Sequence, residues 1–239
     1  MTIAQITAMA FIGASLQAVA LAETVRVVHP IAMPPLIYVK DGKTVGRVAD
    51  VLRVAASREG ITIAFVPMSS GFAAALKNGT ADAVAPMLIS SKNELLYDFT
   101  DAIVTTGGGL FVRAPNGAPS DLTELAGKTV ATPSFGPFVT LIREHYPSMT
   151  LDVTSSYAES ITDVLSKKAD AAALNIDDGA AFVAAAYAGQ ITVPTVMFVK
   201  ESLGLAVAKG SHGDLVRRIN AGLAAIRADG TLQRIEQAW

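Results

Sequence analysis

The stretch from Gly79 to Thr100 (GTADAVAPMLISSKNELLYDFT) constrains the fold more than any other part of the sequence. Its apolar run Ala83–Ala85 has the length and composition of a short buried strand. Pro86 cannot donate a backbone hydrogen bond, so the strand is expected to end there. Ser91, with Glu94 three residues later, forms a capping-box pattern that predicts a helix beginning at Ser91. A strand that delivers its end to a helix N-terminus is typical of a small-anion site.

The same short pattern occurs again in the second half of the chain. Lys168–Ala172 (KADAA) repeats Thr80–Ala83 (TADA), which favours two lobes of similar build. Hydrophobic periodicity predicts strands at Thr24–Val28, Ile61–Val66, Lys128–Thr132, Thr150–Val153, Ala172–Leu174 and Ile191–Val199. It predicts helices at Val48–Ser57, Phe138–His145, Ala158–Ser166 and Asp214–Ala228. The expected fold class is therefore α/β.

Composition and charge exclude several classes of function. Charged residues make up 17% of the chain and the formal net charge is -2, so no nucleic-acid partner is expected. The absence of cysteine excludes disulfide bonds, thiol catalysis, cysteine-ligated zinc and a lipid-modified N-terminal cysteine. His29, His145 and His212 show no metal-ligand spacing. The chain also has no nucleophile elbow, phosphate loop or dinucleotide motif, so we expect no catalytic residues, no metal and no other cofactor.

The N-terminal segment predicts export. Residues 1–22 carry no charged side chain, are mostly apolar and end in Ala20-Leu21-Ala22, the small-x-small pattern of a cleaved secretory signal peptide. An uncleaved membrane anchor is the alternative, and polar residues inside the segment argue against it. No other window is long and apolar enough to span a bilayer. We expect a soluble periplasmic protein without a lipid anchor.

Five ordered groups of motifs carry a family resemblance. They are Asn78–Ala83 with Met87–Ser90, Tyr97–Thr100, Asp121–Val130, Leu203–Val207 and Ala228–Leu232. In this order they resemble the family 3 solute-binding proteins, the periplasmic receptors of polar amino acid ABC importers. The resemblance covers about Thr24 to Trp239.

The resemblance implies the type II periplasmic-binding-protein fold. Each of its two lobes holds a central, mostly parallel sheet flanked by helices, and two crossings join the lobes. Lobe 1 would comprise residues 23–108 and 201–239, and lobe 2 residues 109–200, with hinge crossings at its ends. Gly107–Gly109 would then belong to the first crossing, whereas three successive glycines considered alone are typical of a loop. A monomer would capture a small molecule by hinge closure and deliver it to ABC transporter permease subunits.

The resemblance also places the ligand-binding positions, and several depart from the family pattern. The positions are His29, Met33, Ser69, Ala85, Pro86, Leu88, Asn93, Phe135, Gly136 and Asn175. The family uses an Arg at the position of Asn93 for the ligand carboxylate and an Asp at that of Asn175 for its ammonium. Because both charge partners are absent together, we expect a ligand other than a standard α-amino acid. Drift after loss of binding would produce the same pattern.

Two other functions are left open by the sequence. An enzyme on the same scaffold, such as a periplasmic dehydratase, needs an acid or base in the cleft, and His29 and Asp177 are the candidates. His29 would either face the cleft or pack as a buried ring. Asp177 and Asp178 are interpreted as acids at a helix N-terminus, since the rest of a calcium loop is missing. A sensory lobe serving a kinase or chemoreceptor is the third possibility.

Overall fold

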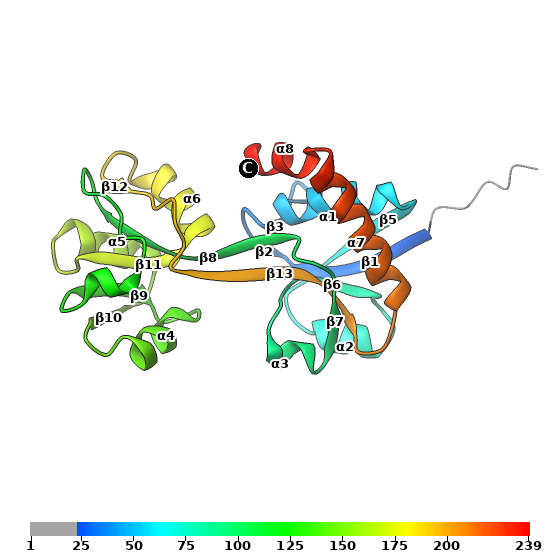
Figure 1. Cartoon of the computed structure of the whole chain (residues 1–239), viewed down its shortest axis with the longest axis horizontal. Helices are drawn as coiled ribbons and strands as arrows, with labels where there is room; N and C mark the ends of the chain where they lie inside the picture. Colours follow the sequence, from blue (N-terminus) through cyan, green and yellow to red (C-terminus); the bar gives the residue numbers. More distant parts are fainter. Residues whose placement is uncertain (1–22) are drawn as a thin grey trace, which may run out of the picture.

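The computed structural model of the protein describes residues 23–239. Two α/β bodies lie at opposite ends of the molecule, and two long strands, β8 (Val104–Arg113) and β13 (Val199–Ala208), run between them (Figure 1). We call the body that holds β1 and the C-terminal helices lobe 1, and the other body lobe 2. The predicted lobe boundary between residues 108 and 109 falls within β8, and the one between residues 200 and 201 falls within β13. The predicted signal peptide, residues 1–22, lies outside the described residues.

Lobe 1 is assembled from both ends of the described chain. Before the first crossing it contains β1 (Glu23–Pro30), β2 (Ala32–Met33), β3 (Ile37–Lys40), β4 (Lys43–Val45), α1 (Arg47–Arg58), β5 (Ile61–Met68), α2 (Phe72–Lys77), β6 (Ala83–Leu88), α3 (Ser91–Glu94) and β7 (Tyr97–Phe99). After the second crossing it adds α7 (Gly213–Ala228) and α8 (Thr231–Gln237).

Lobe 2 is continuous in sequence. It contains the 3-10 helix η1 (Leu122–Leu125), β9 (Thr129–Pro133), α4 (Phe138–His145), β10 (Thr150–Thr154), α5 (Tyr157–Leu165), β11 (Ala171–Asn175), α6 (Ile176–Ala186) and β12 (Ile191–Thr192). The helices predicted for both lobes are confirmed to within one residue at each end.

One sheet runs through both lobes in the order β10-β9-β11-β8-β13-β6-β1-β5, with β7 and β12 paired at its margins. The three strands at each end of this path are mutually parallel, whereas β8 and β13 are antiparallel to each other and to their neighbours in the lobes. This topology confirms the predicted fold class. A separate three-stranded sheet, β2-β3-β4, stands beside the crossing strands.

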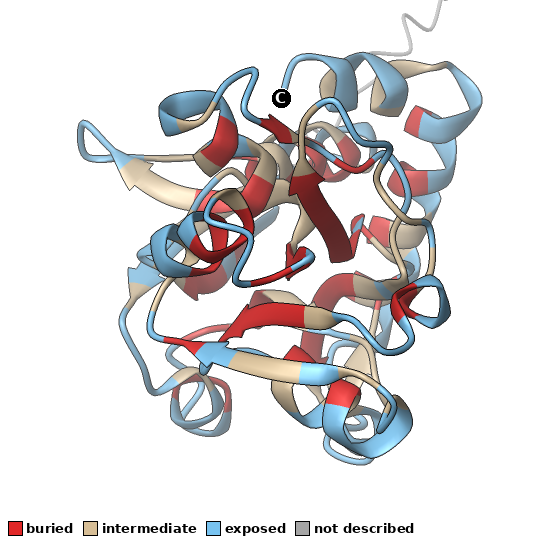
Figure 2. Ribbon diagram, turned by 90° about the vertical axis from the view of Figure 1, so that its left-hand side faces the viewer, coloured by how far each residue is buried: buried red, intermediate tan, exposed pale blue. Residues whose placement is uncertain are grey.

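Helices cover both faces of each half of the sheet. In lobe 1, α1 and α7 cover one face and α2 covers the other; in lobe 2, α4 lies on one face and α5 and α6 on the other. The buried segments concentrate in the strands and on the inner sides of the helices (Figure 2). Burying a large aliphatic side chain contributes about 1.5–3 kcal/mol. The fully buried large side chains include Leu52, Leu205, Ile219 and Leu223 in lobe 1 and Phe111, Ile161 and Leu174 in lobe 2.

The three glycines at the start of the first crossing belong to a regular strand, not to a loop. Gly107, Gly108 and Gly109 all lie in β8 and pair with β13 or β11. A Cβ atom added to Gly109 would lie 2.6 Å from the ring of Pro194, and one added to Gly108 would overlap the ring of Phe198. Glycine is required here because the chain that returns to β13 packs directly against the strand.

Pro86 does not end its strand, contrary to the prediction, and β6 continues to Leu88. The parallel pairing of β6 with β1 stops before Pro86, and its antiparallel pairing with β13 is irregular between Gly204 and Ala206, opposite the proline. No ladder hydrogen bond is needed from Pro86 at this irregularity, so the strand accommodates it.

Two further boundaries and one capping residue differ from the predictions. β1 extends past Val28 to Pro30, because β5 continues to pair with it there. The helix α3 begins at Ser91 as predicted, but the side chain that caps it belongs to Ser90 and accepts from the Asn93 amide at 3.3 Å. The strand predicted at 191–199 is limited to β12, since the chain leaves the sheet before Pro194.

Candidate functional site

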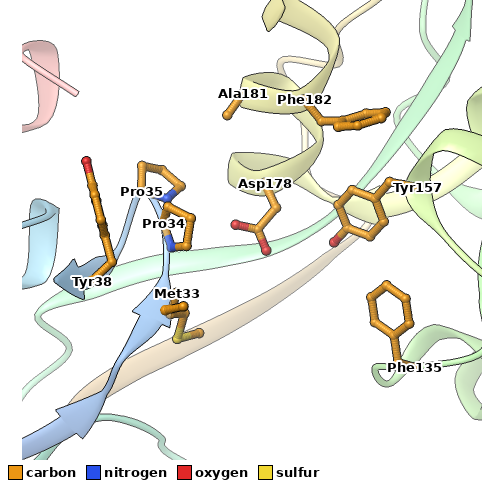
Figure 3. Close-up of a pocket in the computed structure, with 10 residues that line it drawn as sticks. Met33, Pro34, Pro35, Tyr38, Phe135, Tyr157, Asp178, Ala181 and Phe182 are labelled. Carbon is orange, nitrogen blue, oxygen red and sulfur yellow. The ribbon is translucent and has the colours of Figure 1, made fainter. Parts of the chain in front are cut away.

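A cleft of about 700 Å³ lies between the two lobes. It is lined from lobe 1 by Ala32, Met33, Pro34, Pro35 and Tyr38, and from lobe 2 by Phe135, Tyr157, Asp178, Ala181 and Phe182. Figure 3 shows these two groups facing each other across the space beside the crossing strands. A solute held there would contact both lobes at once.

The lobe 1 wall is a short apolar hairpin. β2 pairs with β3 through Ala32 opposite Tyr38 and Met33 opposite Ile37. Leu36 and Ile37 point into the core of lobe 1 and are 1% and 0% exposed, which fixes the hairpin to the lobe. The side chains left facing the cleft are those of the two prolines, Met33 and Tyr38. This wall carries no charged side chain.

The lobe 2 wall is aromatic. The rings of Phe135 and Tyr157 stack with centroids 5.8 Å apart and planes 14° apart, and Phe182 meets Tyr157 edge-on at 6.2 Å. Phe135 stands on the corner between β9 and α4 and is 58% exposed, whereas Tyr157 opens α5 behind the cap Ser156. Burial and the nearby Asp178 carboxylate raise the pKa of Tyr157 to about 12, so its phenol stays neutral.

Asp178 is the one charged residue in the lining of the cleft. It lies in the first turn of α6, where the side chain of Asn175 accepts hydrogen bonds from the amides of Asp177 and Asp178. Among residues 23–239, no side chain forms an ion pair or hydrogen bond with its carboxylate. Burial, with repulsion from Asp177 as the smaller cause, raises the pKa of Asp178 to about 6.

The neighbouring Asp177 is engaged differently. Its carboxylate accepts a 2.5 Å hydrogen bond from the Thr106 hydroxyl on β8 and lies 3.0 Å from Nη2 of Arg47 on α1. Both charged side chains are 15% exposed, so the contact joins the two lobes in a partly buried place. Nη2 and Nε of Arg47 are buried and form no hydrogen bond with any described residue, so the pair is a charge contact and not a bidentate bridge.

Of the sequence-predicted positions, Met33 and Phe135 line the cleft, and Gly136 follows Phe135 at the same exposed corner. The two asparagines are committed elsewhere: Asn93 Nδ2 donates to the Leu88 carbonyl at 2.9 Å, and Asn175 caps α6 and donates to Thr106. The remaining predicted positions are not part of the cleft lining; they are Ser69, Ala85, Pro86 and Leu88.

His29 is a packed ring, the second of the two interpretations the sequence left open. It is 0% exposed, its Nδ1 lies 2.8 Å from the Pro30 carbonyl oxygen, and its Nε2 lies 2.9 Å from Oγ1 of Thr44. Phe65 meets the ring edge-on, and burial lowers the pKa of His29. Both candidates for an acid or base, His29 and Asp177, are therefore engaged by neighbouring groups.

Sequence reasoning missed most of the cleft. Tyr38, Tyr157, Asp178 and Phe182 line the cleft but are not among the positions that the resemblance gave. The sequence signal for this site was the pair of acids Asp177-Asp178 at a helix start. In the described chain only Asp177 has a basic partner, Arg47. A smaller groove shares Pro35 and Ala181 with the cleft and is also lined by Asp177, Pro194 and Trp239. The indole Nε1 of Trp239 donates to Asp50 Oδ2 at 3.1 Å.

Comparison with known proteins identifies the family. A sequence profile described as bacterial extracellular solute-binding proteins, family 3, matches residues 25–239. The chain belongs to this family. The resemblance drawn from the five motif groups is thus confirmed.

Two relatives show how this family 3 chain compares with whole proteins. The ABC transporter glutamine-binding protein GlnH of Bacillus subtilis is 29% identical over 165 residues, which is 69% of this chain and 59% of GlnH. The virulence sensor protein BvgS of Bordetella bronchiseptica is 23% identical over 209 residues, 86% of this chain but 17% of the sensor. The chain therefore spans only part of the length of these relatives.

Solved structures agree with the fold of this family 3 chain. The ancestral amino acid-binding protein AncCDT-1, a precursor of cyclohexadienyl dehydratase, is 26% identical, with a TM-score of 0.64 over 90% of this chain and 94% of AncCDT-1. The periplasmic VFT2 domain of Bordetella pertussis BvgS is 23% identical, with a TM-score of 0.70 over 90% and 93% of the two chains. Because the identity to the VFT2 domain is below 25%, that likeness concerns the fold alone.

Across residues 23–239, no helix has both the length and the apolar character needed to cross a membrane. Within the same part of the chain, no three His, Asp or Glu side chains gather where they could hold a metal ion.

Proposed function

We propose that this family 3 protein is a periplasmic receptor that captures a small molecule between its lobes and delivers it to the permease subunits of an ABC importer. We further propose that the ligand is not a standard α-amino acid. Family membership and the likeness to GlnH support the receptor role. Capture needs no chemistry, only a higher affinity for the closed arrangement of the lobes than for the open one.

The composition of the cleft lining carries the proposal about the ligand. An α-amino acid brings a carboxylate, and burying that charge without a partner is costly. The lining contains no Arg, Lys or His among the described residues. The amide of Asn93, at the position where the family places an Arg, is already used by a backbone carbonyl. A free α-carboxylate would therefore find no cationic partner.

The sensor function is favoured by one observation, the match to 17% of BvgS, which is named as a sensor. Solute capture would be common to a sensor and a transport receptor, so the cleft does not distinguish them. Co-purification of the exported protein with a permease would support transport, whereas signalling by a partner kinase after ligand addition would support sensing.

The enzyme function is favoured by the likeness to a dehydratase precursor. Its candidate acid and base are engaged by other groups: His29 is buried and Asp177 is paired with Arg47. We propose that the protein is not an enzyme. Turnover of a prephenate-like substrate that changes on mutation of His29 would contradict this.

A thermal-shift screen tests the receptor and its selectivity together. We expect no appreciable stabilisation by the standard L-amino acids and clear stabilisation by at least one compound in a broad metabolite panel, because a ligand at about 100 times its Kd adds about 2.7 kcal/mol. Small-angle X-ray scattering should show compaction with the same compound. Stabilisation by micromolar glutamate, arginine or glutamine would overturn the proposed selectivity.

A further inference from the structure

Asp178 places a single negative charge inside the interlobe cleft, and nothing in the described chain neutralises it. Asp177, the neighbouring acid, is matched by Arg47, so that pair adds no net charge. The lining contains no second charged residue. Figure 3 shows the Asp178 carboxylate directed into the space between the two walls, level with the Tyr157 phenol. A ligand that completes this site must bring one positive charge.

The walls around Asp178 suit the hydrocarbon part of such a cation. The stacked rings of Phe135 and Tyr157 and the edge-on ring of Phe182 form the lobe 2 side, and Tyr38 stands across the cleft. The negative face of an aromatic ring attracts a cation, and this attraction is strongest for poorly hydrated ions such as quaternary ammonium groups. Met33 and Pro34 add polarizable and apolar surface on the opposite wall.

The guanidinium of Arg47, which contacts Asp177 beside Asp178, does not offer a place for a carboxylate. Nε and Nη2 of Arg47 are buried, and the group faces Asp177. Arg47 is not part of the cleft lining, so a zwitterion placed against Asp178 would find no cationic side chain in that lining for its negative end. The site therefore discriminates between a simple cation and a zwitterion of similar size.

We infer that the cleft binds an organic cation that lacks a carboxylate, with its ammonium group against Asp178 and its hydrocarbon against Phe135, Tyr157 and Phe182. This inference rests on the proposed function of the cleft as the solute site, and it names the chemical class of the solute. Quaternary ammonium compounds and protonated aryl-alkyl amines are the two forms that satisfy both the charge and the aromatic walls.

Isothermal titration calorimetry with four defined probes tests the inference. Choline and benzyltrimethylammonium carry the required cation. 3,3-Dimethyl-1-butanol is the neutral isostere of choline, and glycine betaine is its zwitterionic counterpart. At pH 7.5 we expect saturable binding of at least one cation and, for choline, binding about tenfold or more tighter than that of the isostere and of betaine.

Two variants locate the charge. Asp178→Asn keeps the shape of the side chain and should weaken cation binding about tenfold or more, with no loss of melting temperature because a desolvated charge is removed. Asp214→Asn is the matched control: it removes an exposed acid in the first turn of another helix, α7, and should leave affinity unchanged.

The outcomes separate this inference from the receptor proposal. Absence of cation binding up to about 10 mM, equal binding of the neutral isostere, or equal binding by Asp178→Asn would each overturn the cation inference. The receptor proposal would survive any of these if a neutral or anionic compound from the broad panel stabilised and compacted the protein. If no compound in that panel did so, the receptor proposal would fail as well.

Discussion

The two walls of the cleft differ in chemistry although one ligand must touch both. The lobe 2 wall carries the unpaired Asp178 and three aromatic rings, whereas the lobe 1 wall consists of Met33, two prolines and Tyr38 on a hairpin anchored in the core. We infer that the two walls have different roles. Lobe 2 provides the charge that selects the solute, and lobe 1 provides an apolar surface that closes over it. Four predictions test this contrast between the walls.

The largest effect is expected from Tyr157, which lies across the cleft from Tyr38. Tyr157→Ala removes the ring that contacts both Phe135 and Phe182, and a desolvated cation–π contact is worth about 2 kcal/mol, or about 30-fold in Kd. Tyr38→Ala on the opposite wall should cost only about threefold. Calorimetric titration of choline or benzyltrimethylammonium into both variants measures the difference; equal losses would remove the contrast between the walls.

Acidification should weaken cation binding about tenfold between pH 7.5 and pH 5. The pKa of Asp178 is raised to about 6, so the carboxylate is ionised above pH 6 and neutral below it, and only the ionised form attracts a cation. Asp177 on the same helix and Tyr157 on α5 are the titratable groups closest to it, and the phenol stays neutral throughout this range. Kd measured against pH should follow this curve in the wild type and be flat in Asp178→Asn.

Met33→Ala tests the lobe 1 wall by itself. Removing part of an apolar side chain that faces the cleft should cost about 1 kcal/mol, or about fivefold in Kd, for cationic and neutral probes alike. Because the wall has no charge, the ratio of choline affinity to 3,3-dimethyl-1-butanol affinity should stay constant. A change in that ratio would show that lobe 1 also contributes to charge selection.

Arg47→Met should change affinity least, by about twofold, while altering the arrangement of the lobes. The side chain contacts Asp177 across the lobes but does not line the cleft. We expect a larger radius of gyration for the ligand-free variant in solution scattering, because a contact between the lobes is lost. Arg53→Met, whose ion pair with Asp50 lies within α1, is the control and should leave the radius unchanged.

Most helices and strands could be predicted from the sequence, because their hydrophobic patterns are clear. Helices such as α4 and α7 have a clear apolar stripe, and motifs such as Asp121–Val130 combine a strand with its preceding turn. The errors involve prolines and glycines. Pro86 and Gly107–Gly109 look incompatible with strands until their neighbours, an irregular ladder and a closely packed return segment, are known. Such partners lie far away in the sequence.

The site was predicted only in part, because its key residues are placed by tertiary structure. Asn175, which the resemblance placed at the position of a ligand-binding Asp, is used as a helix cap, and the acid that faces the cleft is Asp178, in the helix that follows. Periodicity cannot tell which of two adjacent acids is paired, since the partner of Asp177 is on the other lobe. The ligand-binding roles of these residues stay a prediction.

The C-terminal residue, Trp239, gives the molecule an intrinsic fluorescence signal. Trp239 is the single tryptophan of the chain, is 43% exposed, and borders the groove that lobe 1 shares with α6 and Pro194 of lobe 2. If the lobes close on a solute, as proposed, the opposite side of that groove would move relative to the indole and alter the polarity of its surroundings. The emission maximum and its quenching by iodide should therefore follow ligand capture without any label, in a background of no competing indoles.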